Sequence, residues 1–271
     1  MGGTIFQYEF IIKGLFGALF ASITAGLAGT YIVSRRMVFL SGGITHASFG
    51  GIGIGYFTGI NPVIGAAIFG ILSALGIEYL AVKQKIREDS AIGILWAFGM
   101  AVGIIFIYLS PGYTPNLMSY LFGSILTVTI ADIFALGILS VVLILYFGIF
   151  YRTILYISFD EAYARTYSSY VDVFKYITTA LIALTIVLNI RMAGVVLVIS
   201  LLTIPPNIAM LFTKTYSKIV IGSVVTGFAG TVAGYAISYF AGIPVGATII
   251  FTLVVIWVIL KLLNQLMKKH I

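Results

Sequence analysis

A histidine at position 46 is the side chain in this sequence that is best suited to chemistry. It lies in the stretch "SGGITHASFGG", residues 41–51, and the only other histidine, His270, stands next to the last residue. Neutral imidazole is the commonest nitrogen ligand for divalent transition metals, so His46 could bind a metal ion. The alternative is a histidine that donates a hydrogen bond to a carbonyl group of a neighbouring helix.

A second set of polar side chains lies in "LVISLLTIPPNIAML", residues 197–211. Ser200, Thr203 and Asn207 are spaced i, i+3 and i+7, which places them on one face of a helix. The two consecutive prolines before Asn207 remove backbone donors, so carbonyl groups in the preceding turn are free to meet water or an ion. An ordinary proline kink is the alternative.

The sequence lacks the motifs that common classes of enzyme need. It has no GxxxxGK[ST] phosphate loop and no HExxH zinc motif, and it shows neither a Ser/His/Asp arrangement nor an intramembrane carboxylate pair. Glu78 is expected to extend from a span end to the interface, and Asp132 to cap the start of a helix. We therefore expect no enzymatic activity and no permanently bound cofactor.

The elements that position these residues must be membrane-spanning helices. Of the 271 residues, 61% are hydrophobic and only 8% are charged, and the mean hydropathy is +1.15. A soluble domain could not cover its surface with so little charge, so the composition indicates an all-α polytopic membrane protein with one domain, residues 1–271. About eight or nine spans are expected, with candidates at 10–34, 44–59, 62–83, 90–110, 131–151, 175–190, 194–213, 219–240 and 245–265.

Basic residues fall in the connectors between these spans and account for the net charge of +7. By the positive-inside rule these connectors are cytoplasmic. The N-terminus of this cell-membrane protein is then outside the cell and its C-terminus inside the cell. No basic groove with interleaved aromatic residues occurs, so nucleic acid is not an expected partner.

Two features depart from this simple pattern. The stretch "LMSYLFGSIL", residues 117–126, is too short to cross a bilayer and is expected to be a re-entrant or surface helix. Arg191 falls on the outer side, where it either extends to the interface or lines an outer mouth.

Small residues recur at helical spacing around His46. The stripe that they form consists of Gly43, Ala47, Gly51 and Gly55. Such a stripe lets a second helix backbone approach closely. His46 lies one residue, about 100°, from Ala47, and therefore faces the protein interior or its edge. Gly42 and Gly50, one turn to either side, are expected to leave open space beside the imidazole.

The connector "SFDEAYARTYSSY", residues 158–170, is polar and contains no span of its own. It predicts a short amphipathic helix with Asp160 and Glu161 in the first turn and Arg165 later. A helix of this kind on the cytoplasmic face is suited to docking a cytoplasmic partner. A plain interfacial loop helix is the alternative.

Five segments, in order along the chain, carry a family resemblance. They are "SRRMVFLSGGITHASFGGIGIGY", "EDSAIGILWAFGMAVGIIFI", "LMSYLFGSIL", "FDEAYARTYS" and "GVVLVISLLTIPPNIAMLFTK…GIPVGATII". Together they resemble the metal-ion permease subunits of zinc- and manganese-type ATP-binding cassette (ABC) importers. The similarity covers nearly the whole chain.

The resemblance implies a homodimeric permease with the compact helical bundle of type II ABC importers. Two ATPase subunits would lie on its cytoplasmic face and bind the ATP, and an extracytoplasmic metal-binding protein would deliver the ion. The segment 158–170 would be the coupling helix that contacts the ATPase, through Phe159, Asp160, Glu161, Ala162 and Arg165.

The stretch around His46 departs from the family pattern at one position. Members of the family commonly read GDxLxHA, with an aspartate one helical turn before the histidine. In this chain Gly42 stands in place of that aspartate, and Ser41 in place of the glycine before it. A site that relies on imidazole, hydroxyl and carbonyl groups favours zinc over manganese. The expected lining of the metal path is Ser41, Gly42, Thr45, His46, Ser200, Thr203 and Asn207.

These observations predict a membrane-spanning permease subunit of an ABC importer for a divalent transition metal, zinc or manganese, that works by alternating access. A permease of the same fold for a metal chelate is one alternative, which the missing aspartate keeps open. A stand-alone channel or secondary carrier is another, but the chain has no carboxylate relay, and such a protein would not need a docking helix.

Overall fold

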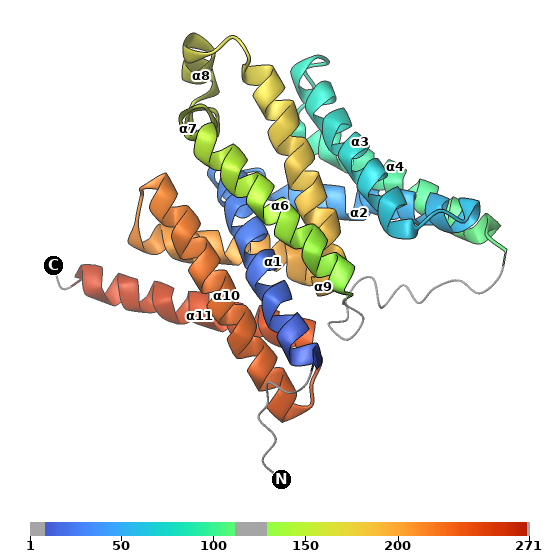
Figure 1. Cartoon of the computed structure of the whole chain (residues 1–271). Coiled ribbons are helices and arrows are strands. Elements are labelled where there is room, and N and C mark those ends of the chain that lie inside the picture. The colour runs from blue at the N-terminus through green and yellow to red at the C-terminus, as the bar shows by residue number, and fades with distance from the viewer. Residues whose placement is uncertain (1–8, 112–128, 270–271) are drawn as a thin grey trace.

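The structure is a computed structural model that describes the backbone of residues 9–111 and 129–269 (Figure 1). The predicted re-entrant stretch, 117–126, lies outside the described residues. Within them the chain forms ten α-helices and no strand. The helices are α1 (Glu9–Ser34), α2 (Val38–Thr58), α3 (Pro62–Val82), α4 (Glu88–Leu109), α6 (Ile130–Ile149), α7 (Tyr151–Phe159), α8 (Glu161–Tyr167), α9 (Val171–Phe212), α10 (Tyr216–Ala241) and α11 (Val245–Lys269).

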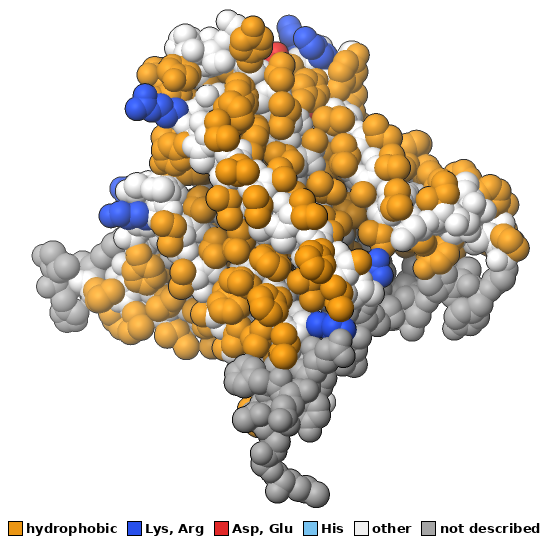
Figure 2. Space-filling model, in the orientation of Figure 1, with side chains coloured by type: hydrophobic (Ala, Val, Ile, Leu, Met, Phe, Trp, Pro, Cys, Tyr) orange, Lys and Arg blue, Asp and Glu red, His pale blue; other side chains and the backbone are white. Residues whose placement is uncertain are grey.

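Seven of the described helices are long and apolar enough to cross a membrane. They are α1, α3, α4, α6, α9, α10 and α11. This confirms an all-helical, multi-pass membrane protein, with fewer separate candidate helices than the eight or nine spans predicted. The difference arises because α9 runs through two predicted spans and because α2, which is rich in glycine and contains His46, is not among the seven. Figure 2 shows hydrophobic side chains over most of the visible surface.

Helix α9 is the central element of the fold and contains 42 residues. It consists of two helical halves joined by a kink, and at about 1.5 Å per residue the two halves together are roughly twice as long as the ~30 Å hydrocarbon core of a bilayer. Its one non-helical residue is Gly194, with φ 73° and ψ 165°, a conformation that favours glycine. The predicted spans 175–190 and 194–213 therefore correspond to the two halves of α9 on either side of Gly194.

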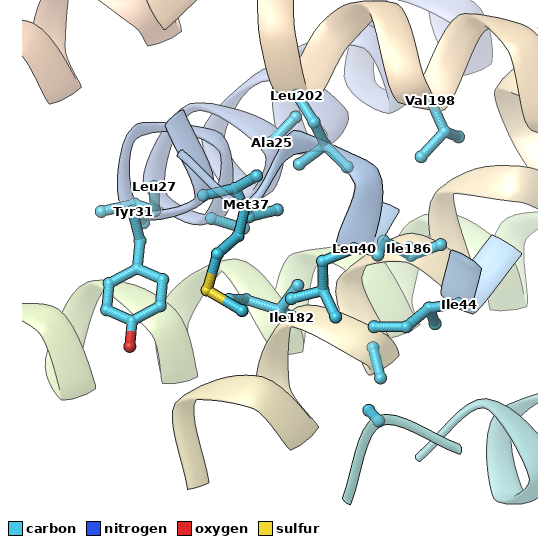
Figure 3. Packing of buried hydrophobic residues seen from close by; sticks show 14 of the residues in the cluster. Ala25, Leu27, Tyr31, Met37, Leu40, Ile44, Ile182, Ile186, Val198 and Leu202 are labelled. Carbon is cyan, nitrogen blue, oxygen red and sulfur yellow. The ribbon is translucent and has the colours of Figure 1, made fainter. Parts of the chain in front are cut away.

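The core packs other helices around α9 in two groups. Helices α2, α3 and α4 pack together at the right of Figure 1, whereas α1, α6, α10 and α11 pack on the other side of α9. Figure 3 shows where α1, α2 and α9 meet in the buried core. The labelled residues are Ala25, Leu27, Tyr31, Met37, Leu40, Ile44, Ile182, Ile186, Val198 and Leu202. Close packing of this kind holds helices together in lipid, which offers no hydrophobic advantage for association.

The connectors predicted to share one side of the membrane meet at one end of the bundle. An Nη2 atom of Arg35, between α1 and α2, lies 3.3 Å from Glu88 Oε1 at the start of α4 and 3.5 Å from Glu161 Oε2 on α8. The ring of Tyr216, at the start of α10, contacts the rings of Tyr151 and Phe159 from α7. The basic connectors are therefore neighbours in space.

Of the two acidic residues expected at span ends, the structure confirms the prediction for one and contradicts it for the other. Asp132 forms a capping box with Thr129 at the start of α6, as predicted, and its Oδ1 also lies 3.3 Å from Arg191 Nε. The prediction for Glu78 was wrong, because this side chain is only 1% exposed and its Oε1 lies 2.9 Å from Lys175 Nζ. A buried cation on α9 removes the need for the carboxylate to extend to water.

Candidate functional site: a histidine at a helix crossing and a docking helix

His46 is half-buried on α2 and stacks on an aromatic ring of α4. The centroids of the His46 and Trp96 rings are 4.4 Å apart, and the ring planes differ by 6°. Stacking uses the face of the imidazole, whereas a metal bond uses the lone pair in the plane of the ring. The contact therefore orients the imidazole ring and leaves its nitrogen lone pair available for a metal bond.

The two glycines on either side of His46 have different surroundings. A Cβ atom at Gly42 would lie 3.7 Å from Trp96 Cζ3 and 3.9 Å from Ile199 Cδ1, which are ordinary contacts. A Cβ atom at Gly50 would lie only 2.9 Å from both the Gly99 carbonyl oxygen and Phe69 Cζ. The predicted open space therefore exists at Gly42, but the prediction was wrong for Gly50, where α2 lies directly against α3 and α4.

The stripe of small residues on α2 lies against both neighbouring helices. A Cβ atom at Gly43 would collide with Ile92 of α4, and one at Gly51 with the backbone of Gly65 on α3. Farther along, a Cβ atom at Gly55 would lie 2.8 Å from the Cα of Pro62, and Ala47 packs against Gly99. These contacts hold the helix that carries His46 between α3 and α4.

The hydroxyl residues predicted near His46 lie on a different side of α2. Ser41 and Thr45 are fully buried, whereas His46 and Gly42 are partly exposed. Ser41 Oγ donates to the carbonyl oxygen of Val38 at 2.7 Å, and Thr45 Oγ1 donates to that of Ser41 at 2.6 Å. In this conformation their hydroxyl groups bond to their own helix.

The polar face predicted on α9 is accessible. Asn207 is exposed and Ser200 and Thr203 are half-buried, and each bonds to a carbonyl oxygen one turn earlier, at 2.7–3.0 Å. On α9, the side chain that approaches Gly42 belongs to Ile199, next to Ser200. The polar face of α9 therefore begins beside the segment of α2 that carries His46.

The two prolines in α9 serve packing. Both are buried, and the helix continues through them. Pro206 cannot donate to the Leu202 carbonyl, and a Cβ atom at Gly29 of α1 would collide with that oxygen. The carbonyl group of Leu202 thus lies against α1.

The predicted docking helix is present but shorter than expected. It comprises α8, residues 161–167, and α7 precedes it directly. Asp160 is the N-cap, with its carboxylate accepting from the Tyr163 backbone nitrogen at 3.0 Å. Glu161 Oε1 and Arg165 Nη2 are 2.8 Å apart along the helix. Exposed side chains on and beside α8 include Phe159, Ala162, Tyr163, Tyr167 and Tyr170.

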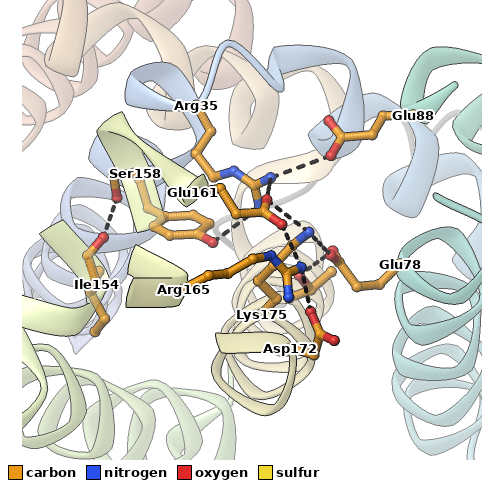
Figure 4. A network of polar contacts seen from close by, with 11 residues as sticks. Arg35, Glu78, Glu88, Ile154, Ser158, Glu161, Arg165, Asp172 and Lys175 are labelled. Carbon is orange, nitrogen blue, oxygen red and sulfur yellow. Dashed lines mark hydrogen bonds and ion pairs between the residues drawn. The ribbon is translucent and has the colours of Figure 1, made fainter. Parts of the chain in front are cut away.

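Ion pairs tie α8 to the transmembrane helices (Figure 4). Glu161 Oε2 lies 3.0 Å from Lys175 Nζ on α9, and Arg165 Nη2 lies 2.7 Å from Asp172 Oδ1. Burial alone would raise the pKa of Glu161, but its bonds to Arg165 and Lys175 outweigh burial and hold this pKa below its usual value. Sequence reasoning missed Lys175 and Arg35, because nothing in their spacing pairs them with Glu161.

Within the described residues, no three His, Cys, Asp or Glu side chains come together as a metal site. Comparison with known proteins shows the family to which the chain belongs. Residues 7–264 match the ABC 3 transport family. The chain belongs to this family. It is a membrane permease of an ABC importer and not itself the ATPase, which implies ATPase and binding-protein partners.

Individual members of this ABC 3 family match nearly the whole chain. It is 40% identical to the uncharacterized membrane protein slr2045 of Synechocystis sp., over 90% of this chain and 87% of that protein. It is 32% identical to the manganese transport system membrane protein MntC of Listeria monocytogenes, over 94% of this chain and 91% of that protein. The solved structure of PsaBC from Streptococcus pneumoniae in complex with Fab matches with a TM-score of 0.82 and 29% identity, over 94% and 92% of the two chains. The fold of this ABC 3 permease is thus that of type II importers.

Proposed function

We propose that this permease imports manganese as a free divalent ion and that His46 contacts the ion during passage. The observation that carries the choice of metal is the similarity, over 94% of the chain, to a manganese transport system membrane protein. Zinc is the competing cargo, because Gly42 rather than an aspartate stands one helical turn before His46, and no three His, Cys, Asp or Glu side chains come together in the described residues. A metal chelate has no comparable support.

The proposed path runs along the exposed edges of α2 and α9. His46 and Gly42 are partly exposed on α2, and Ser200, Thr203 and Asn207 supply oxygen atoms on the accessible face of α9, which begins next to Ile199, the α9 residue that approaches Gly42. Ser41 and Thr45 would join the path only if α2 moves, together with α3 and α4, relative to its other neighbours, because both are buried in this conformation. Such a movement fits a permease that alternates between two states.

The proposed complex is a homodimer of one permease domain per chain, with its basic connectors on the cytoplasmic side. In this orientation the N-terminus is outside, the C-terminus is inside, and α8 lies on the cytoplasmic face beside the ATPase. The exposed aromatic side chains around α8 and the charges of Asp160 and Arg165 support a protein contact there.

Metal uptake by reconstituted vesicles tests this proposal. Vesicles that contain the permease, its ATPase and its binding protein are expected to take up manganese with ATP, and to prefer it to zinc in competition. His46→Ala should lower uptake at limiting metal by at least about tenfold while dimer assembly is unchanged. His270→Ala is the matched control. Normal uptake by His46→Ala would show that the imidazole does not contact the ion. Preference for zinc over manganese would show that zinc is the cargo.

A further inference from the structure

Lys175 is a buried cation that lies between two carboxylates from different helices. Its Nζ atom is 2.9 Å from Glu78 Oε1 on α3 and 3.0 Å from Glu161 Oε2 on α8 (Figure 4). The Lys175 side chain is 4% exposed and that of Glu78 is 1% exposed, whereas Glu161 is 32% exposed. The lysine therefore connects a surface helix to a carboxylate in the interior.

Glu78, on α3, makes a second contact with α9. Thr179, one turn after Lys175, donates its hydroxyl group to Glu78 Oε2 at 3.2 Å. Buried charges are costly to separate, because a lost partner leaves an uncompensated ion away from water. Helices α3 and α9 are thus tied at this level, and α8 is tied to both through one ammonium group.

Helix α3 is in turn inseparable from the helix that carries His46. The backbones of Gly51 on α2 and Gly65 on α3 are so close that neither position has room for a Cβ atom. A displacement of α3 must therefore move α2. The contacts run without a gap from α8, through Lys175 and Glu78, to the helix of the proposed metal path.

Other ion pairs of α8 are less suited to this role. Arg35 Nη2 lies 3.5 Å from Glu161 Oε2, farther than Lys175 Nζ does. The Arg165 side chain is 47% exposed, and its partner Asp172 lies on α9 close to α8. Solvent-exposed ion pairs are weak and screened. The buried lysine is the firmest connection.

We propose that Lys175 is the positioning residue that transmits movement of α8 to α3 and α9, so that ATP hydrolysis is coupled to metal passage. This inference rests on the proposed function, in which the ATPase docks on α8. Lys175 contacts neither metal nor nucleotide in this proposal. It acts by holding Glu161 and Glu78 together.

The double variant Glu78→Gln/Lys175→Met tests the proposal without leaving either buried partner charged and alone. With the ATPase in vesicles, it should still hydrolyse ATP, but the manganese taken up per ATP should fall roughly tenfold, within the range usual for coupling between distant sites. The matched control is Arg87→Gln/Asp89→Asn, which removes an exposed ion pair that borders α4. This control should keep the wild-type ratio.

The exchange variant Glu78→Lys/Lys175→Glu separates coupling from stability. It keeps an ion pair between α3 and α9 but places a second carboxylate against Glu161, so it should also lose manganese uptake per ATP. A wild-type ratio in either variant overturns the role of Lys175 and leaves the proposed function standing. If the wild-type complex itself takes up no metal with ATP, the proposed function fails, and the coupling inference fails with it.

Discussion

The indole of Trp96 lies parallel to the imidazole of His46, 4.4 Å away between ring centroids. The same indole lies 3.7 Å from the position that a Cβ atom at Gly42 would occupy. Trp96 therefore borders both His46 and Gly42, the position at which the family resemblance led us to expect an aspartate. In this chain an aromatic side chain shapes the place where a carboxylate ligand would otherwise project.

Trp96 is expected to hold His46 in its metal-binding orientation. Trp96→Phe keeps an aromatic face and should retain most uptake, whereas Trp96→Leu should weaken manganese uptake at limiting metal by about tenfold, a loss typical when a ligand's supporting contact is removed. Uptake in vesicles at saturating metal should differ much less between the two variants. Equal uptake by both variants at limiting metal would show that the stack does not position the imidazole.

Gly42→Asp is expected to strengthen manganese binding. The position accepts a Cβ atom with ordinary contacts, and an aspartate there would stand one helical turn from His46, which adds a hard carboxylate ligand. We expect an affinity gain on the order of tenfold, equivalent to about 1.4 kcal/mol, with slower release. Equilibrium metal binding to the purified protein measures the gain, and Gly42→Asn is the control of similar shape. Equal affinity of both variants would place the metal elsewhere.

Gly51→Ala is expected to destabilise the protein. Its methyl group would collide with the backbone of Gly65, which cannot yield as a flexible side chain could. Overpacking of this kind costs about 1–3 kcal/mol, so the purified protein should unfold at a lower temperature. Gly42→Ala is the matched control on the same helix and should melt like the wild type. A wild-type melting temperature for Gly51→Ala would refute the close approach of α2 and α3.

Local features of this chain could be predicted from sequence because they depend on neighbouring residues. Hydropathy predicted the bounds of α3, α4, α6, α10 and α11 closely, and Asp132 was predicted to cap the start of a helix. The docking helix was recognisable from a polar stretch between apolar ones. Each of these depends on a segment short enough to be interpreted alone.

Pairings between distant helices were not predictable in the same way. A periodic pattern shows which face of a helix is buried, but it does not show which face of another helix meets it. The stack of Trp96 on His46, the contact of Lys175 with Glu78 and the tight crossing at Gly50 all depend on such meetings. The break at Gly194, by contrast, falls where the sequence predicted the boundary between the spans 175–190 and 194–213.

Charge reversal in α8 is expected to uncouple the ATPase. Asp160→Lys/Glu161→Lys removes the N-cap acceptor, repels the positive end of the helix and sets a cation against Lys175. ATP hydrolysis stimulated by the permease should be abolished, as measured with a separately expressed ATPase subunit. Arg87→Asp, which changes an exposed charge on a neighbouring connector, is the control. Unchanged stimulation in the α8 variant would show that the ATPase docks elsewhere.

Acidification is expected to weaken the α8 ion pairs only at low pH. Glu161 has its pKa held below the usual value of about 4.3, because bonds to Arg165 and Lys175 outweigh the effect of burial. A carboxylate whose pKa is lower in the folded state than in the unfolded state stabilises the fold. This stabilisation is complete above the pKa of the unfolded state and is lost as the pH falls through the pKa of the folded state. The gap in melting temperature between wild type and Glu161→Gln should therefore be constant from about pH 7 to about pH 5 and close only below about pH 4.3. A gap that already begins to change near about pH 6 would mean that the pKa of Glu161 is raised in the folded state, against the cationic surroundings seen here.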